Sequence, residues 1–335
     1  MKRTQVDILM PVFNAEATLP ACLKSLSRQT EKRWRCWAID DGSTDASPEI
    51  LQDAAVRDTR IHLISKKHEG IVSALNTGMR YCTAPKTARM DADDWMHQKR
   101  LALQISALRK NPRWSAVGCH VRGFPRGDMT AGGRRYEAWL NGVQNEKDLC
   151  SEAWIECPVA HPSLMFQTST LQAFGYHEHG WPEDYDLVLR MLTQGKHIGM
   201  VPQKLLSWRD SPNRLSRTSP RYQLDAFTRC KAFYLVQNFL ASHARYVLWG
   251  HGPTGRRLRR SLAEYDRSPS HIVEVHPRRI GQVLRGAPVI VPEDLLDLRP
   301  ERIVVSVAGA SPRAKIRMAL NAMGFQENQD YVCAA

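Results

Sequence analysis

The first hundred residues alternate short apolar runs with segments whose apolar residues recur at helical spacing. The apolar runs predict strands at 8–13, 36–39, 61–64 and 87–90. The helical spacing predicts helices at 17–28, 48–56 and 71–79. Ser47, followed by Pro48, is expected to cap the second helix. This alternation predicts an α/β domain with a mostly parallel sheet and helices on both faces.

The pattern weakens after Trp95 and returns near the C-terminus. Between them, helices are predicted at 184–192 and 221–240, and a short strand at 164–166. After Ala244 the strand–turn–helix signature restarts, with strands at 246–249, 272–273, 289–291 and 303–307 and a helix at 312–323 that Gly324 ends. We therefore expect two domains, residues 1–240 and a small Rossmann-like α/β domain at 245–335.

A glycine-rich loop follows the first strand of the second domain. Gly250, Gly252 and Gly255 have the spacing of a dinucleotide-binding fingerprint, and Glu274 stands about twenty residues further on. Such a loop directs backbone N–H groups and a helix N-terminus at a pyrophosphate. The same turn also occurs in Rossmann-like domains that bind another nucleotide or nothing. NAD(P) is therefore a cofactor that the sequence permits but does not favour.

Composition excludes several classes of protein. The chain has 335 residues, of which 43% are hydrophobic and 24% charged, which is typical of a globular protein and not of a disordered one. The net charge of +13 is compatible with phosphate-bearing partners, but no run of five cations marks a nucleic-acid arm, and we expect no nucleic-acid partner. Eight scattered cysteines predict reduced thiols rather than a zinc ribbon.

The sequence was also searched for targeting and membrane-spanning segments. We find no signal-peptide pattern at the start and no window of 18 uninterrupted apolar residues. The expectation is a cytoplasmic protein, whose arginine-rich surface permits peripheral attachment at the inner face of a membrane.

Two acidic clusters follow predicted strands. Asp91-Ala92-Asp93-Asp94 comes directly after the strand at 87–90, and Asp40-Asp41 follows the strand at 36–39. Ligands of open α/β sheets bind at the carboxyl ends of the strands. Asp91 and Asp93 can share a hard divalent cation that also holds substrate phosphates. The alternative is that each cluster is an acidic turn that caps the next helix.

At these clusters the sequence resembles the family 2 glycosyltransferases of the GT-A fold, over roughly residues 5 to 210. The matching blocks, in the family's order and spacing, are Pro11-Val12-Phe13-Asn14-Ala15-Glu16, Ile39 to Asp45, Gly70 with Asn76 and Gly78, Met90 to Asp94, and Arg100-Leu101. The resemblance implies a nucleotide-diphosphate sugar donor, a Mg or Mn ion held by Asp91 and Asp93, and inversion at the anomeric carbon.

The resemblance also implies roles for single residues of the donor site. Asp93 is the expected metal ligand, and Asp91 lies nearer the ribose and the donor sugar. The residues implied to line the nucleotide pocket are Pro11, Phe13 and Asn14, with Asp41 and Asp40 at the base or ribose.

Trp181-Pro182-Glu183-Asp184 precedes a predicted helix and resembles the family's Glu-Asp catalytic motif. Asp184 is the implied base and Glu183 orients it or touches the donor sugar. The alternative is that both are favourable anions in the first turn of a helix. Trp181 and His161 are candidates for the acceptor pocket, although a lone histidine is more often structural.

Three positions bear on how far the resemblance extends. Arg209 stands where relatives carry an aromatic-Arg-x-His element that closes over the diphosphate, so it is a candidate phosphate ligand. Ser211 replaces that histidine, which leaves Asp210 as a substitute metal ligand. His68 stands where relatives show asparagine, a change that concerns loop geometry.

The sequence therefore predicts an inverting, metal-dependent glycosyltransferase that acts on a glycan or lipid-linked hydroxyl in cell-surface polysaccharide synthesis. One alternative is an NAD(P)-dependent oxidoreductase that uses the glycine-rich loop. A second is a non-catalytic module that binds nucleotide sugars.

Overall fold

A computed structural model describes residues 3–211, 214–299 and 301–335. The chain forms two compact units. The first contains residues 1–149, 158–179 and 194–214, and the second contains 150–157, 180–193 and 215–335. Helix α6 (Glu146–Glu152) contains the first point at which the chain passes between them.

The first unit is built on an eight-stranded sheet with the order β3-β2-β1-β4-β7-β6-β8-β5. Its strands are β1 (Val6–Val12), β2 (Trp34–Asp40), β3 (Ile61–Ser65), β4 (Lys86–Arg89), β5 (Trp95–Met96), β6 (Trp114–Phe124), β7 (Met165–Gln167) and β8 (His197–Arg209). Strands β3, β2, β1 and β4 are parallel, as the alternating pattern predicts. The short β7 runs antiparallel between β4 and β6, and β8 is parallel to β6.

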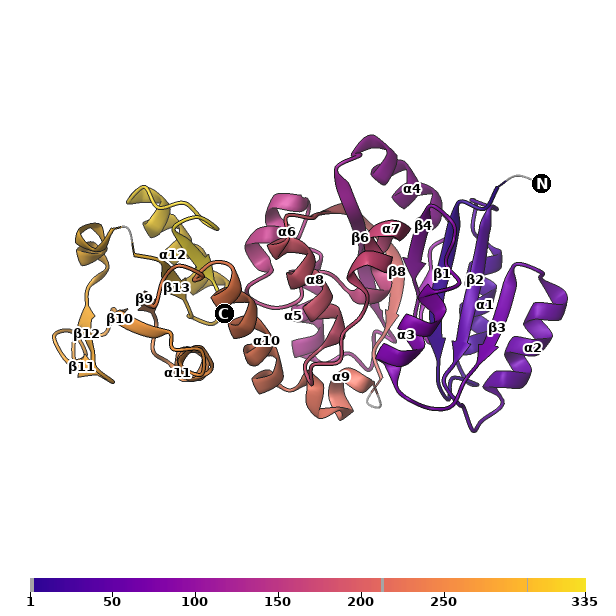
Figure 1. The fold of residues 1–335 in the computed structure, drawn as a ribbon, viewed down its shortest axis with the longest axis horizontal. Helices are drawn as coiled ribbons and strands as arrows, with labels where there is room; N and C mark the ends of the chain where they lie inside the picture. Colours follow the sequence, from indigo (N-terminus) through magenta and orange to yellow (C-terminus); the bar gives the residue numbers. More distant parts are fainter. Residues whose placement is uncertain (1–2, 212–213, 300) are drawn as a thin grey trace. The chain divides into compact units, whose positions relative to one another are not determined.

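Helices pack on both faces of this sheet (Figure 1). They are α1 (Leu19–Ser27), α2 (Ser47–Arg57), α3 (Ile71–Met79), α4 (Arg100–Lys110), α5 (Ala131–Leu140), η1 (His161–Ser163) and α7 (Thr168–Phe174). Helix α3 lies so close to the sheet that a Cβ on Gly78 would stand 2.4 Å from Leu9 Cδ1. Only glycine permits this approach.

Two details of the predicted elements are wrong. Ser47 is the first residue of α2 and not its cap; its Oγ instead accepts a hydrogen bond from Ala15 N at 2.8 Å. The long strands β6 and β8 were not predicted. Their apolar pattern is broken by Pro202, Gln203 and Lys204 and by register shifts around His120, and such irregular strands lack a clean period.

The second unit contains a six-stranded sheet with the order β11-β12-β10-β9-β13-β14. Its strands are β9 (Arg245–Trp249), β10 (Ser268–Val273), β11 (Val283–Leu284), β12 (Ala287–Ile290), β13 (Ile303–Val305) and β14 (Tyr331–Cys333). Apart from the antiparallel β11, all neighbours are parallel. In chain order the five parallel strands are arranged 3-2-1-4-5, the Rossmann arrangement.

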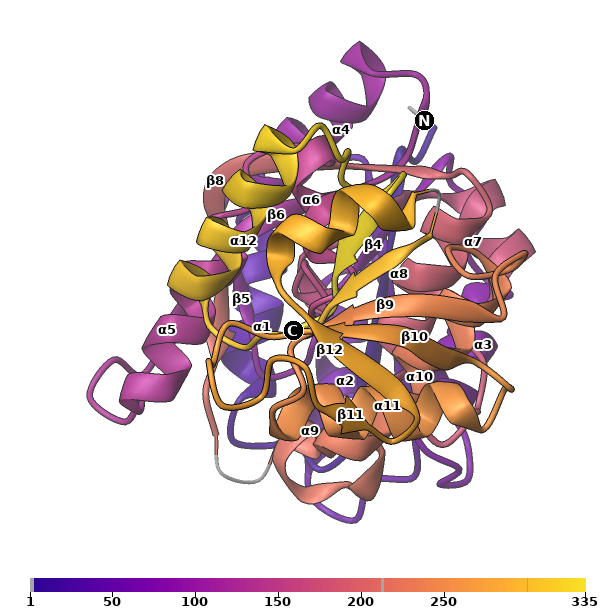
Figure 2. The same cartoon turned by 90° about the vertical axis from the view of Figure 1, so that its left-hand side faces the viewer.

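The helices of the second unit are α8 (Glu183–Thr193), α9 (Leu215–Thr218), η2 (Pro220–Tyr222), α10 (Leu224–Gln237), α11 (Pro253–Ala263), η3 (Pro292–Leu298) and α12 (Ala310–Ala322). Figure 2 shows α11 and α12 on opposite sides of the six-stranded sheet. Gly324 has φ +80°, which confirms it as the residue that ends the last helix. The helix predicted at 221–240 is shorter, because Tyr222 belongs to a separate 3₁₀ turn.

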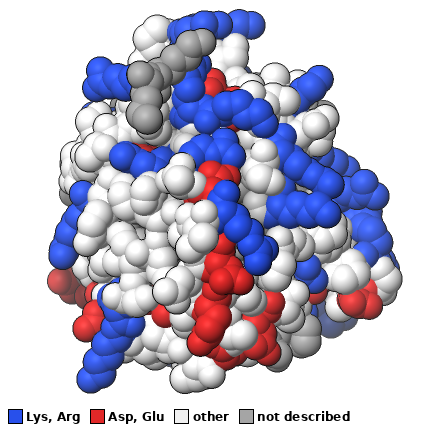
Figure 3. Space-filling view, turned by 90° about the vertical axis from the view of Figure 1, so that its right-hand side faces the viewer, with Lys and Arg blue, Asp and Glu red and all other residues white. Residues whose placement is uncertain are grey.

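The cysteines are reduced thiols, as their scattered positions predict, and the surface carries charges of both signs (Figure 3). All eight cysteines are free and seven are buried. The face in Figure 3 carries Lys and Arg around its edges and a band of acidic side chains across it, so its charge is mixed rather than uniformly cationic. Among the described residues, no helix is both long and apolar enough to cross a bilayer.

Candidate active site

Three carboxylates meet where strand β4 ends. The chain turns through Asp91, Asp93 and Asp94 before β5 begins, and oxygens of all three lie within 4.8 Å of one another. Asp91 and Asp93 are half-buried and Asp94 is buried. The structure thus brings together the two aspartates expected to hold a metal, and it adds Asp94 to them.

The chemistry of this acidic turn fits a divalent cation. Burial, and next the charge of Asp91, raise the pKa of Asp93 to about 6. Burial and the two neighbouring carboxylates raise the pKa of Asp94 as well. Asp94 Oδ2 is buried and has no hydrogen-bond partner among the described residues. A hard cation with oxygen ligands would relieve both the repulsion and the missing partner.

Buried arginines stand behind the acidic turn. Arg89 Nη2 donates to Asp91 Oδ1 at 2.7 Å, and the Arg89 side chain is only 2% exposed. Arg100 is also buried; its Nη2 donates to the backbone oxygen of Arg89 and its Nε to Gln104 Oε1. These contacts fix Asp91 from the protein side. Arg89 was missed by the sequence analysis, although it lies only two residues before Asp91.

Arg209, at the end of β8, is bonded to the same turn. Its backbone N donates to Asp94 Oδ1 at 2.8 Å, and its Nε donates to Asp93 O at 2.9 Å. Its guanidinium lies 4.6 Å from the Phe124 ring centroid. Arg209 is therefore next to the acidic turn, as expected of a phosphate ligand, but its Nε positions the turn itself. Asp210 follows it, with its N donating to Phe124 O at 2.6 Å.

The loops after β1 and β2 are joined at the same edge of the sheet. Asn14 has a left-handed backbone, φ +48°, that its own bonds explain: its N donates to Ser43 Oγ and its Oδ1 accepts from Thr44 N. Pro11 lies on β1 opposite Ile39 of β2. The pocket residues expected from the sequence are thus neighbours in space.

Asp41 organises the loop that precedes α3. Its carboxylate accepts hydrogen bonds from Lys66 Nζ, Glu69 N and Gly70 N, at 2.8, 3.1 and 2.8 Å. Asp40, also buried, accepts from Ser43 N at 3.1 Å. Both expected base or ribose ligands are therefore engaged with the protein, and Asp41 in particular shapes the loop.

An exposed aromatic pair lies beside Asp41. The rings of Phe13 and His68 stack with centroids 4.2 Å apart, and Phe13 is 47% exposed. His68 Nδ1 is 3.0 Å from Asp41 O. Gly42 is required here, because its φ is +74° and a Cβ would stand 2.7 Å from His68 N. The unusual His68 thus contributes a flat surface next to the nucleotide-pocket residues.

The Glu-Asp pair opens helix α8 in the second unit. Asp184 keeps partial solvent exposure, and its Oδ1 accepts from Tyr185 N. Burial, and next the charge of Glu183, raise the pKa of Asp184 to about 7. Glu183 is buried, accepts from Tyr222 Oη at 2.6 Å and lies 3.9 Å from Arg221. Glu183 is therefore held in place, whereas Asp184 is poised to take a proton near neutral pH.

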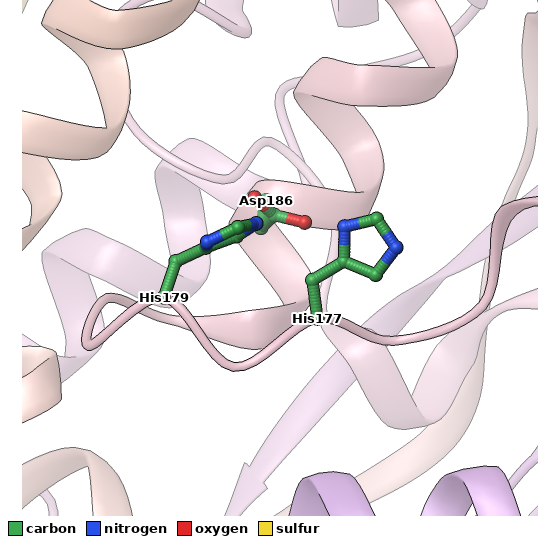
Figure 4. A group of neighbouring side chains, drawn as sticks. All are labelled: His177, His179 and Asp186. Atoms are coloured by element: carbon green, nitrogen blue, oxygen red, sulfur yellow. The ribbon is translucent and has the colours of Figure 1, made fainter.

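Trp181 and Asp186 belong to the structural support of α8. Asp186 is buried; its Oδ1 accepts from Trp181 Nε1 and Tyr234 Oη, and its Oδ2 pairs with Arg190 at 2.9 Å. Figure 4 shows Asp186 on this helix. With its oxygens already occupied, Asp186 is a structural residue, and Trp181 is tied to it.

His161 is also buried. Its Nε2 is 2.9 Å from Tyr176 Oη, and burial lowers the pKa of the imidazole well below its usual value. Asn76 holds the backbone of Tyr176 through two hydrogen bonds, at 2.8 and 3.0 Å. His161 and Asn76 thus fix the segment around Tyr176, and in this structure His161 serves packing.

The glycine-rich loop has the backbone that its fingerprint requires. Gly250 has φ +95°, and a Cβ on Gly255 would stand 2.1 Å from Gly250 O, so both positions need glycine. Glu274 Oε1 accepts from His251 N at 3.1 Å and pairs with Arg279 Nη1 at 2.9 Å. Glu274 therefore fastens the loop instead of presenting both oxygens to a ligand.

The open, mostly parallel sheet, with acidic residues at its carboxyl edge, defines a transferase of the GT-A type. It has this fold in common with solved transferases. Staphylococcus aureus TarS 1-349 in complex with UDP superimposes with a TM-score of 0.54, at 14% identity, over 78% of this chain and 70% of that one. The mannosyltransferase PcManGT from Pyrobaculum calidifontis, in complex with GDP-Man and Mn²⁺, superimposes with a TM-score of 0.50 at 18% identity. The match covers 97% of this chain and 82% of that one.

Residues 7–172 match the model of the glycosyl transferase family 2, and the chain is a glycosyltransferase of this family. A curated relative is the amylovoran biosynthesis glycosyltransferase AmsE of Erwinia amylovora, 26% identical over 215 residues, which are 63% of this chain and 78% of that protein. The chain spans only 28% and 14% of the length of two other relatives.

Proposed function

We propose that this glycosyltransferase is inverting and metal-dependent and transfers a sugar from a nucleotide-diphosphate donor to an acceptor hydroxyl. One observation supports it above the others: Asp91, Asp93 and Asp94 converge within 4.8 Å with one buried oxygen unpartnered by any described residue. Solved neighbours of the same fold bind UDP, UDP-GlcNAc and GDP-Man.

The acidic turn would hold a Mg or Mn ion. Such an ion, when bound, supplies neutralisation of the charge that develops on the leaving diphosphate. Asp91 Oδ1 is paired with Arg89 and Asp94 Oδ1 accepts from Arg209 N, so each of these two residues would offer the ion its second carboxylate oxygen beside Asp93. Arg209, which donates to Asp93 O, fixes the backbone of the turn, and its two Nη groups donate to no described residue and would serve a phosphate.

Asp184 would act as the base. In an inverting transfer the acceptor oxygen bonds to the anomeric carbon as the bond to the diphosphate oxygen breaks, and the acceptor's hydroxyl proton must leave. Asp184, with a pKa of about 7, takes that proton. The negative charge of Glu183 helps to keep the pKa of Asp184 raised. Tyr222 and Arg221 hold Glu183 in position for this effect.

The nucleotide would lie over the joined loops of β1 and β2. Phe13 and His68 offer a stacking surface for a base, while Asp41 maintains the loop that carries His68. Asp40 and Asn14 hold the neighbouring turn.

We further propose an acceptor in cell-surface polysaccharide synthesis, a glycan or a lipid-linked sugar. AmsE, which the chain covers well, is named for the biosynthesis of one such polymer. We also propose that the protein is cytoplasmic, and its net charge of +13 favours peripheral attachment to an anionic membrane surface.

The proposal is tested with a thermal-shift screen of UDP-, GDP-, dTDP- and CMP-sugars with and without Mn²⁺. We expect added Mn²⁺ to increase the stabilisation by one nucleotide sugar, and Asp93→Asn to abolish that metal-dependent shift. The matched control is Asp53→Asn, which removes an exposed carboxylate on α2. Identical metal-dependent shifts in Asp93→Asn and in the wild type would contradict the proposal.

A further inference from the structure

The second sheet has a topological switch point of its own, apart from the acidic turn of the first unit. Its central strands β9 and β13 are parallel neighbours from which the chain order runs outward in both directions. Such a switch point leaves a crevice at the carboxyl ends of the two strands. The loop from Gly250 to Gly255 follows β9, and Ser306 follows β13.

Two buried polar atoms at this edge lack partners among the described residues. Ser306 is 3% exposed and its Oγ makes no hydrogen bond, and His251 is 8% exposed and its Nε2 makes none. Ser306 flanks the first turn of α11, because a Cβ on Gly255 would stand 3.7 Å from Ser306 Cβ. Unsatisfied buried polar atoms are rare in proteins and commonly indicate a missing ligand or water.

The loop leaves space where a ligand would need it. A Cβ on Gly252 would have no described atom within 4 Å, in contrast to Gly250 and Gly255. Gly252 caps the eleven-residue helix α11 without any side-chain hydrogen bond from the described residues to the first turn. The N–H groups and the positive end of the helix dipole are therefore available to an anion.

The charge around the loop also suits an anion. Arg256 Nη1 lies 3.4 Å from His251 O, and Arg279 pairs with Glu274, which in turn binds His251 N. Arg259 is a further positive charge near His251. Three arginines against one glutamate leave an excess of positive charge beside the helix N-terminus.

We propose that this edge is a second binding site, specific for the phosphate groups of a nucleotide or dinucleotide. Gly252 and the first turn of α11 bind the phosphates, and Ser306 and His251 supply side-chain hydrogen bonds. Because Glu274 Oε1 is engaged by His251 N and Arg279, Glu274 cannot offer both oxygens to a ribose diol, and the phosphates are the main recognised part. The site lies wholly in the second unit and does not depend on the acidic turn.

The test is isothermal titration calorimetry of the full-length protein in EDTA, which removes metal-dependent binding at the first site. The probes are inorganic pyrophosphate, UDP, GDP, NAD⁺ and NADP⁺. Gly252→Asp places a carboxylate at the cap of α11, a position that favours Asp, so the helix stays folded while phosphate is repelled. Gly127→Asp, which adds the same charge at an exposed loop of the first unit, is the matched control.

We expect at least one probe to bind, Gly252→Asp to weaken it tenfold or more, and Gly127→Asp and Asp93→Asn to change it less than twofold. Equal affinity for pyrophosphate and nucleotides means that the site reads phosphate alone. Tighter binding of one nucleotide identifies the nucleoside part as a second determinant. No saturable binding of any probe, or equal binding by a folded Gly252→Asp, overturns the proposal. Loss of binding in Asp93→Asn would instead locate it at the first site.

Discussion

The pH dependence of transfer gives the sharpest test of the proposed base. Asp184 must be ionised to accept the acceptor's proton, and its pKa lies at about 7. The ionised fraction of such a group rises from about 9% at pH 6 to about 91% at pH 8, so kcat/KM should rise about tenfold over this interval. This rise is the acidic limb of the pH profile. An ordinary aspartate would be fully ionised throughout the interval, and the profile would have no such limb.

The assay is release of the nucleoside diphosphate, followed across pH 5.5 to 8.5 at saturating Mn²⁺. Glu183→Gln removes the neighbouring charge that raises the pKa of Asp184, while its amide oxygen can still accept from Tyr222. We therefore expect the limb to move to lower pH in this variant. Asp184→Asn should lower the rate by a factor of 10² to 10⁴ or so at every pH, the usual contribution of a general base.

Asp225→Asn serves as the matched control, because it removes an exposed carboxylate from another helix of the same unit. It should leave both rate and limb unchanged. The reasoning fails if Asp184→Asn retains the wild-type rate. It also fails if the limb stays in place in Glu183→Gln, or if it moves with the Mn²⁺ concentration, which would indicate titration of the metal ligands.

The remaining predictions concern stability. Gly42→Ala should lower stability by about 1–2 kcal/mol or more, because an alanine must adopt φ +74° and its Cβ meets His68 N; denaturant unfolding measures this. Asp93→Asn should raise the melting temperature in EDTA, because it removes repulsion within the acidic turn, and should abolish any further rise on adding Mn²⁺; differential scanning calorimetry measures both. Asp184→Asn should raise the melting temperature above pH 7 and have little effect near pH 4. The raised pKa makes the folded state bind more protons than the unfolded state, so stability falls as pH rises through this interval.

Each of these has an outcome that contradicts it. Gly127→Ala has neither a strained backbone nor a close neighbour, and an equal loss there would show that the Gly42 effect is not local. An unchanged or lower melting temperature of Asp93→Asn in EDTA would mean that the carboxylates do not repel one another. A stability difference for Asp184→Asn that does not vary with pH would exclude the linkage argument.

The alternating pattern of the first ninety residues was enough to predict β1 to β4 and the helices between them. Regular βα units bury one continuous apolar strand and one helical stripe each, so their period survives in the sequence. The strands β6 and β8 were not predicted, because register shifts and polar residues interrupt their apolar pattern. Their pairing is decided by contacts between segments about eighty residues apart.

The residues of the candidate site likewise fall into those that the sequence identifies and those that it does not. Asp91, Asp93 and Asp184 could be named from the sequence, since each stands in a short motif beside a regular element. Arg89, Tyr222 and the Phe13–His68 stack could not, because no local spacing marks them.

The regular βα units, the glycine-rich loop from Gly250 to Gly255 and the candidate carboxylates could be recognised in the sequence, because each depends on neighbours along the chain. Tertiary structure decided which carboxylates remain free. Asp41 and Asp186 look as reactive in sequence as Asp93 and Asp184, but protein donors occupy their oxygens. The donors to Asp41 come from the segment before α3, and Asp186 is bonded by Arg190 on its own helix and by Tyr234 on α10. Burial and like charges leave Asp93 and Asp184 with raised pKa values, and burial depends on packing, which no local pattern specifies.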